Sequence, residues 1–255
     1  MAILPVLLAQ PQLVPLTSLF CGPSRFSTAD QGGMCGCADN SNWVIKRGKA
    51  DNPFSAHNEW VCANLACAAG VPVAPYNIIE HLDGTLCFGS QFMVGEITDW
   101  QNLVIAGNIP VQDIAASINQ ILALDLFILN LDRHFGNYFV IKTNSFYEMF
   151  AIDHGRAWRF GAFPLNELAL PACNTSNAFR EMQARFPPFY DPALVIKTLN
   201  EIGTITTEQV GTIINRQPVG WLSQAEIDET LSWWDNEAVA RVDGIVERVN
   251  NGSFI

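Results

Sequence analysis

An apolar stretch that runs directly into a polar loop constrains the fold of this chain more than any other feature. Residues 111–129 carry large aliphatic side chains at helical spacing, which predicts a helix buried on most sides. The polar segment NLDRHFGN at 130–137 follows at once, and two β-prone runs within 138–152 predict a hairpin. Because a hairpin reverses the chain, it returns Asp153 to the neighbourhood of Asn137.

The rest of the chain divides into a β-prone first part and a helical second part. Expected strands cover 13–20, 43–46, 73–80 and 85–94, an expected loop covers 24–42, and an expected helix covers 55–69 with Ser55 as N-cap. A last long helix begins at the capping box SQAE, residues 223–226, and runs towards Val249. We therefore predict an α+β fold in two lobes, a β-rich N-terminal lobe at 1–95 and a helical C-terminal lobe at 96–255, with one cleft between them.

Three side chains around the central loop have the chemistry of a phosphate-handling site. Asn137 and Asp153 offer the hard oxygen atoms that Mg²⁺ prefers, and Asp132 is a carboxylate shortly before Asn137. Phosphoryl transfer needs a cation on the phosphates, oxygen ligands for magnesium and a carboxylate near the incoming hydroxyl. The alternative is that these residues only make turn hydrogen bonds or cap the next segment, because Asp and Asn are common in turns. Because all three residues occur together after a buried helix, we favour a phosphate-handling site over a purely structural role.

Lys46 supplies the expected cation. It ends the apolar run WVIK, where a partly buried ammonium is unfavourable unless an anion meets it. Glu59 lies in the next helix among apolar neighbours and is the candidate partner. A strand lysine paired with a helix glutamate is how a kinase fixes its phosphate-binding lysine. The alternative for Lys46 is an edge-strand side chain whose ammonium reaches solvent.

A glycine-rich run, GGMCGC at 32–37, stands just before that strand. Its backbone amides, at Gly33 and Gly36 above all, could approach phosphate oxygens. A flexible hairpin turn explains the run equally well. Ser27 and Thr28 precede it and are candidate autophosphorylation sites.

Charge and hydropathy narrow the classes of partner. The formal net charge is -11, which disfavours direct binding of nucleic acid or of an anionic membrane surface. The apolar first 16 residues lack a basic region, contain three prolines and are too short to span a bilayer. We expect a soluble, cytoplasmic protein.

The cysteine and histidine pattern predicts neither a disulfide framework nor a metal cluster. The seven cysteines are scattered and include no C-x-x-C pair, so buried reduced thiols are expected. Cys35 and Cys37 lack a second pair at zinc-ligand spacing, and the four histidines show no i, i+4 spacing. Arg133, within the polar loop, could neutralise phosphate or form an internal ion pair.

Together these motifs resemble the HipA-like kinases, bacterial Ser/Thr kinases with a protein-kinase-related fold of two lobes. The resemblance spans about residues 25–160. It rests on WVIK at 43–46, NE at 58–59 in a helix that ends AGVPVA at 69–74, NLDRHFGN at 130–137 and IDHG at 152–155.

The resemblance implies a role for each matching position. Lys46 would hold the ATP phosphates with Glu59 as its partner, Asp132 would be the catalytic base, and Asn137 and Asp153 would ligate Mg²⁺. The strand end at Gln91, Phe92 and Met93 would be the adenine hinge. ATP and Mg²⁺ would be the cofactors, and a protein with a Ser or Thr acceptor would be the substrate. An antitoxin protein is a further implied partner, because some members of the family are toxins held inactive by a DNA-binding antitoxin.

The motifs also leave alternatives open. The third motif is Asp-His-Gly, where typical protein kinases have Asp-Phe-Gly, which questions an activity switch based on phenylalanine. The order Asp-Arg-His-x-x-Asn also resembles phosphoinositide kinases, although the acidic balance argues against a lipid surface as substrate. A small-molecule kinase and a catalytically silent nucleotide-binding protein are the other candidates.

Overall fold

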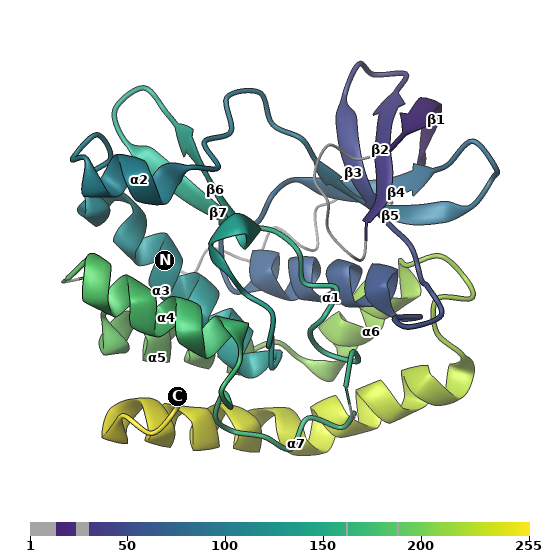
Figure 1. Ribbon diagram of the computed structural model, residues 1–255. Helices are drawn as coiled ribbons and strands as arrows, with labels where there is room; N and C mark the ends of the chain where they lie inside the picture. The colour runs from purple at the N-terminus through teal and green to yellow at the C-terminus, as the bar shows by residue number, and fades with distance from the viewer. Residues whose placement is uncertain (1–13, 24–30, 162, 188) are drawn as a thin grey trace.

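Strands gather in the N-terminal part of the molecule and helices in the C-terminal part (Figure 1). The computed structural model describes residues 14–23, 31–161, 163–187 and 189–255. The predicted α+β organisation, with a β-rich N-terminal lobe and a helical C-terminal lobe, is confirmed. The division at residue 95 stays a prediction.

Five strands of the N-terminal lobe close into a small barrel with the order β1-β2-β3-β5-β4. Their bounds are β1 Leu16–Gly22, β2 Gln31–Cys37, β3 Asn42–Lys46, β4 Tyr76–Glu80 and β5 Leu86–Gln91. Neighbouring strands are antiparallel except β1 and β4, whose parallel pairing closes the barrel. The interior is filled by Cys35, Cys37, Trp43, Ile45, Ile79 and Cys87. The register of β3 on β5 places Lys46 opposite Phe88, so the lysine ends a strand in the middle of the sheet order.

The predicted loop at 24–42 is wrong in its second half, because the glycine-rich run forms strand β2. Glycine is needed there for packing. Gly33 has a φ of +124°, and a Cβ added to it would lie 2.5 Å from the carbonyl oxygen of Gly22 on β1. A Cβ on Gly36 would overlap the ring of Phe20. Close approach of two strands therefore accounts for these glycines without a ligand. Ser27 and Thr28 lie outside the described residues.

Helix α1 (Ser55–Ala68) runs between the barrel and the helical lobe and is buried on nearly every side (Figure 1). It contacts β3 and β5 above and α6 below. The predicted N-cap is wrong by one residue. Phe54 occupies the N-cap position, and Ser55 is the first helical residue and makes no capping bond. Trp60 donates its indole N–H to the Ile213 carbonyl oxygen at 2.8 Å, which ties α1 to α6.

The helical lobe is built around α3, which confirms the predicted buried helix. Its elements are α2 Trp100–Ile105, α3 Val111–Phe127, β6 Tyr138–Lys142, β7 Tyr147–Ala151, α4 Asn174–Arg185, α5 Pro192–Gly203, α6 Thr207–Asn215 and α7 Gln224–Asn251. Strands β6 and β7 pair as the predicted hairpin. The Ser223 side chain accepts from the Glu226 N–H, and the Glu226 side chain accepts from the Ser223 N–H, so the predicted capping box is confirmed.

One pair of cysteines contradicts the prediction of reduced thiols. Cys21 on β1 and Cys35 on β2 form a disulfide, whereas Cys37, Cys62, Cys67, Cys87 and Cys173 are free. The two residues are direct cross-strand partners in the β1–β2 pair. Their sequence separation of 14 residues contains no recognisable pattern, and the strand register alone brings them together.

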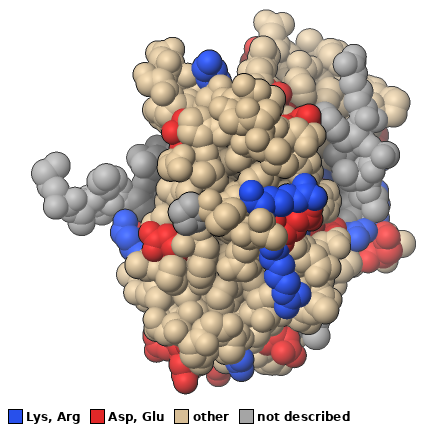
Figure 2. Space-filling model, turned by 60° about the vertical axis from the view of Figure 1, so that its left-hand side comes forward, with Lys and Arg blue, Asp and Glu red and all other residues tan. Residues whose placement is uncertain are grey.

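The surface drawn in Figure 2 carries basic and acidic side chains in small groups, and its most prominent basic side chains lie beside acidic ones. Within the described ranges, no helix is both long enough and apolar enough to cross a membrane.

Buried His57 on α1 makes stability depend on pH. Burial lowers the pKa of His57 from 6.5 to about 4, although a hydrogen bond with Gln217, 2.7 Å away, opposes the shift. Because the folded state resists protonation and the unfolded chain does not, stability is lost as pH falls from 6.5 towards 4. We expect the free energy of unfolding to decrease by about 2 kcal/mol from this group between pH 7 and pH 5. Urea unfolding of the wild type and of His57→Gln, which cannot titrate, measures the difference. Parallel pH profiles of the two proteins would contradict it.

Candidate active site

Lys46 sits at the centre of a buried ionic cluster that joins three elements. It is the last residue of β3 and is 4% exposed. Its Nζ lies 2.5 Å from Oδ1 of Asp153, after β7, and 3.4 Å from Oε1 of Glu59 on α1. The prediction that an anion pairs with this buried ammonium is confirmed, since two carboxylates lie beside it.

Glu59 is held in its charged form inside the protein. Burial raises its pKa, but the Lys46 ammonium and hydrogen bonding with His154 lower it by more, so the net shift is downward. Oε1 also accepts the Gly155 N–H at 3.1 Å, and Oε2 lies 3.6 Å from Nδ1 of His154. Glu59 therefore orients both the lysine and the segment that follows Asp153.

The backbone of segment 153–155 is fixed from several sides. Asp153 adopts a φ of +63°, an uncommon conformation that a short polar residue tolerates and that surrounding contacts must hold. The Gly155 carbonyl oxygen accepts from the side-chain amides of Asn52 and Asn58, each at 3.0 Å. A Cβ on Gly155 would lie 2.9 Å from Oγ of Ser55, so this contact requires glycine.

Asp132 and Asn137 are linked within the central loop. The Asn137 side-chain N–H donates to the backbone carbonyl of Asp132 at 3.0 Å, which leaves its amide oxygen as the atom suited to bind a cation. The Asp132 carboxylate accepts from the Asn174 amide at 2.6 Å and lies 3.6 Å from the Arg156 guanidinium. It is partly exposed, so an incoming hydroxyl can reach it.

Arg133 holds this loop against the hairpin. Of the two roles considered for it, neutralising phosphate or forming an internal ion pair, its contacts show the internal ion pair. It is fully buried and bonds both carboxylate oxygens of Asp125 on α3 at 2.9 Å. Its NH1 group donates to the backbone carbonyls of Asn137 and Ile152. Since Ile152 directly precedes Asp153, one guanidinium positions both proposed metal ligands.

The contacts therefore form a continuous path through four of the residues singled out in the sequence. Lys46 touches Asp153, the neighbouring Ile152 N–H donates to the Asn137 carbonyl at 3.1 Å, and Asn137 bonds Asp132. An amide oxygen and a carboxylate brought together in this way are hard donors, so Asn137 and Asp153 fit a Mg²⁺ ion that keeps further ligands from water or phosphate.

The predicted adenine hinge lies at the end of a strand, and the two predicted phosphate-binding glycines lie within a strand. At the end of β5, the N–H groups of Gln91 and Phe92 donate to backbone carbonyls. The Met93 N–H donates to Oε1 of Glu96 at 2.7 Å, so an adenine could take this donor only by replacing a side chain that can move. Gly33 and Gly36 lie in β2, opposite Ile45 and Asn42 of β3, and not in a loop.

Sequence reasoning gave no role to five residues that shape the site: Asn52, Asn58, His154, Arg156 and Asn174. Asn58 and His154 lie within the motifs of the family resemblance, so a signal was available for these two. Asn174 gave none, since it meets Asp132 from 42 residues away in sequence.

Solved structures with a similar fold include a kinase and a protein of a toxin–antitoxin system. The proinflammatory kinase CtkA of Helicobacter pylori has a TM-score of 0.63 at 13% sequence identity, with 95% of this chain and 100% of that chain covered. HipA of Shewanella oneidensis MR-1, from a structure of its toxin–antitoxin system with HipB and operator DNA, has a TM-score of 0.50 at 13% identity, with 97% and 71% covered. At these identities the likeness shows the fold. A comparison with curated proteins gave no match.

The match to a known protein family covers much more of the chain than the sequence motifs do. The HipA-like kinase family matches residues 27–254, whereas the sequence motifs alone suggested a resemblance over about 25–160. The match includes strands β2 to β5 of the barrel, α1, the central loop and the helices through α7. The chain belongs to the HipA-like kinase family.

Proposed function

We propose that this kinase transfers the γ-phosphoryl group of ATP, with Mg²⁺, to a Ser or Thr hydroxyl of a protein. The observation that carries the proposal is the buried contact of Lys46 with Asp153 and Glu59, joined through Asn137 to Asp132. This set contains each group that phosphoryl transfer requires.

In this proposal each side chain has one task. Lys46 holds phosphate oxygens, and Glu59 keeps the lysine extended from β3. Asn137 and Asp153 would hold Mg²⁺, which neutralises charge on the phosphates when it is bound. Asp132 orients the acceptor hydroxyl and takes its proton, while Asn174 and Arg156 hold the carboxylate in place.

The charge of the chain and a structural neighbour bear on the substrate and the partner. The net charge of -11 disfavours a lipid surface, which supports a protein acceptor. HipA of Shewanella oneidensis is seen with HipB, so we propose a toxin role with a restraining protein partner. Use of ATP and the lack of a membrane-spanning helix among the described residues accord with a cytoplasmic location.

Replacing Asp132 tests the proposed base. We expect Asp132→Ala to lower phosphoryl transfer by at least about 10²-fold, because one transition-state contact is lost. The assay follows transfer from ATP labelled at its γ-phosphate to proteins of a cell extract, and mass spectrometry then locates the phosphate on Ser or Thr. Asp243→Ala, at an exposed position of α7, is the matched control and should keep full activity.

The outcome distinguishes the alternatives. Equal activity of Asp132→Ala and the control would remove Asp132 as base. Label that appears only on small molecules or lipids would overturn the protein substrate, and ATP binding without transfer would support a silent nucleotide-binding protein.

Replacing Lys46 tests its proposed role in phosphate binding. We expect Lys46→Met to lower kcat/KM for ATP by at least about 10²-fold, since the cation on the phosphates is lost. Lys197→Met removes a largely exposed lysine on α5 and should leave kcat/KM unchanged. Circular dichroism of both variants checks the fold, and an unaltered KM and kcat for Lys46→Met would exclude the proposed role.

Glu59→Gln tests the buried cluster itself. The change keeps the shape of the side chain but removes one of the anions that meet the buried Lys46 ammonium, and we expect a loss of about 3 kcal/mol in the free energy of unfolding. Urea unfolding measures this loss. Glu247→Gln, at an exposed position of α7, is the control and should change stability by less than about 0.5 kcal/mol. Equal stability of the two variants would show that the Glu59 carboxylate is not needed to stabilise the buried lysine.

A further inference from the structure

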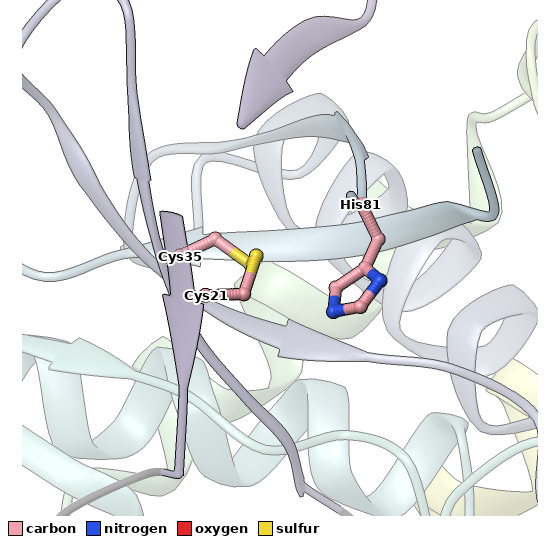
Figure 3. Close-up of side chains that lie close together, drawn as sticks. All are labelled: Cys21, Cys35 and His81. Carbon is pink, nitrogen blue, oxygen red and sulfur yellow. A yellow bond between two sulfur atoms is a disulfide. The ribbon is translucent and has the colours of Figure 1, made fainter. Parts of the chain in front are cut away.

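Two cysteines and one histidine of the β-barrel, none of them a residue of the proposed kinase site, lie close together (Figure 3). Cys21 on β1 and Cys35 on β2 are cross-strand partners, and His81 directly follows β4. One candidate ligand atom from each residue lies within 4.8 Å of the other two. In the part of the chain that the structure describes, this is the one group of three or more metal-ligating side chains with such spacing.

The barrel topology creates this group. Strand β1 pairs with β2 on one side and with β4 on the other, and the register places Thr17 beside Glu80. His81 therefore emerges next to β1, although it is far from both cysteines in sequence. The spacing argument against a metal cluster considered only neighbours along the chain and could not detect this group.

His81 is already oriented as a metal-binding histidine is. Its Nδ1 lies 3.0 Å from Oδ1 of Asp83, and the other Asp83 oxygen lies 3.5 Å from the Arg47 guanidinium. The Thr85 N–H also donates to this carboxylate at 2.9 Å. The shorter contact of Nδ1 with the carboxylate, against 3.4 Å for the Asp83 backbone N–H, favours the tautomer with its proton on Nδ1 and leaves Nε2 to bind the metal, as in carboxylate–histidine–zinc arrangements. Figure 3 shows the ring beside the two sulfur atoms.

The distances suit a tetrahedral zinc ion once the disulfide opens. Zn–S bonds of about 2.3 Å and Zn–N bonds of about 2.0 Å at tetrahedral angles separate two sulfurs by about 3.8 Å and a sulfur from a nitrogen by about 3.5 Å. Once the bond between them opens, rotation of the two side chains on neighbouring strands can bring the sulfurs to this separation. Cys21 and His81 are partly exposed, which gives an ion access.

We propose that Cys21, Cys35 and His81 form a Zn²⁺ site that exists only when the Cys21–Cys35 disulfide is reduced, with water as the fourth ligand. Two molecules of a thiol reductant break the S–S bond, leave as their own disulfide and give two protein thiols. Zinc binding then releases the two thiol protons and forms two Zn–S bonds. Thiolate and imidazole donors in tetrahedral geometry select zinc over Mg²⁺ or Ca²⁺.

The two states constrain the barrel differently. The disulfide joins β1 to β2, whereas zinc would also join the turn between β4 and β5 through His81. The site and the disulfide exclude each other because they use the same sulfur atoms.

Zinc binding by the full chain tests the proposal without any activity assay. The protein is reduced with a phosphine, which does not compete as a thiol, and is then titrated with Zn²⁺ against a chromogenic chelator. Co²⁺ replaces zinc in a parallel sample, where thiolate charge-transfer bands and intense d–d bands report tetrahedral S/N ligation. We expect one zinc per reduced chain and none in the oxidised chain.

Variants assign the ligands. We expect Cys21→Ser, Cys35→Ser and His81→Gln each to abolish stoichiometric binding, and Asp83→Asn to weaken it by about 10-fold or more. Cys67→Ser removes an exposed free thiol on α1 and should bind zinc as the wild type does. His81→Gln keeps the disulfide, so an unchanged melting temperature of its oxidised form shows that the fold is intact.

Two results would overturn the proposal. Reduced wild-type chain that takes up no zinc at micromolar concentration would show that the pair serves only as a disulfide. Equal zinc affinity of His81→Gln and the wild type would show that other thiols bind the ion.

Discussion

A lysine ammonium enclosed by protein is the constraint around which this structure is organised. Burying such a charge costs several kcal/mol unless anions and hydrogen bonds compensate. Lys46 receives its two anions from different elements, Glu59 from α1 and Asp153 from the end of the β6–β7 hairpin. The barrel, the helix and the hairpin must therefore take up one relative arrangement, because any other leaves at least one buried charge alone.

A second buried cation fixes the position of the central loop relative to the hairpin. Arg133 pairs with Asp125 and also binds the carbonyls of Asn137 and Ile152. Its five donors in a fixed plane suit this combination of carboxylate and backbone oxygens, which a lysine could not satisfy. The arginine lies next to Asp132 in sequence but serves the scaffold, so that the carboxylate and amide beside it can face a substrate.

The barrel links this organisation to the cysteine and histidine group. Cys35 lies on β2, whose other edge pairs with β3, the strand that ends at Lys46. A bond between β1 and β2, whether a disulfide or the proposed zinc link, therefore acts one strand away from the lysine. The glycines of β2 allow the close strand contacts on which this arrangement depends.

The sequence by itself determined the buried helix α3, the hairpin, the capping box at Ser223, the two-lobe α+β organisation and the pairing of Lys46 with Glu59. These features depend on periodicity, caps and the cost of burying a lone charge, all of which act over short segments or on a single residue. Only the tertiary structure decided that the glycine run is a strand, that Cys21 meets Cys35 and His81, and that Asn52, Asn58 and Asn174 hold the site. Those contacts join residues that are distant along the chain, up to 103 positions for Asn52 and Gly155. Strand register and helix packing set them, and no local pattern in the amino-acid sequence encodes either one.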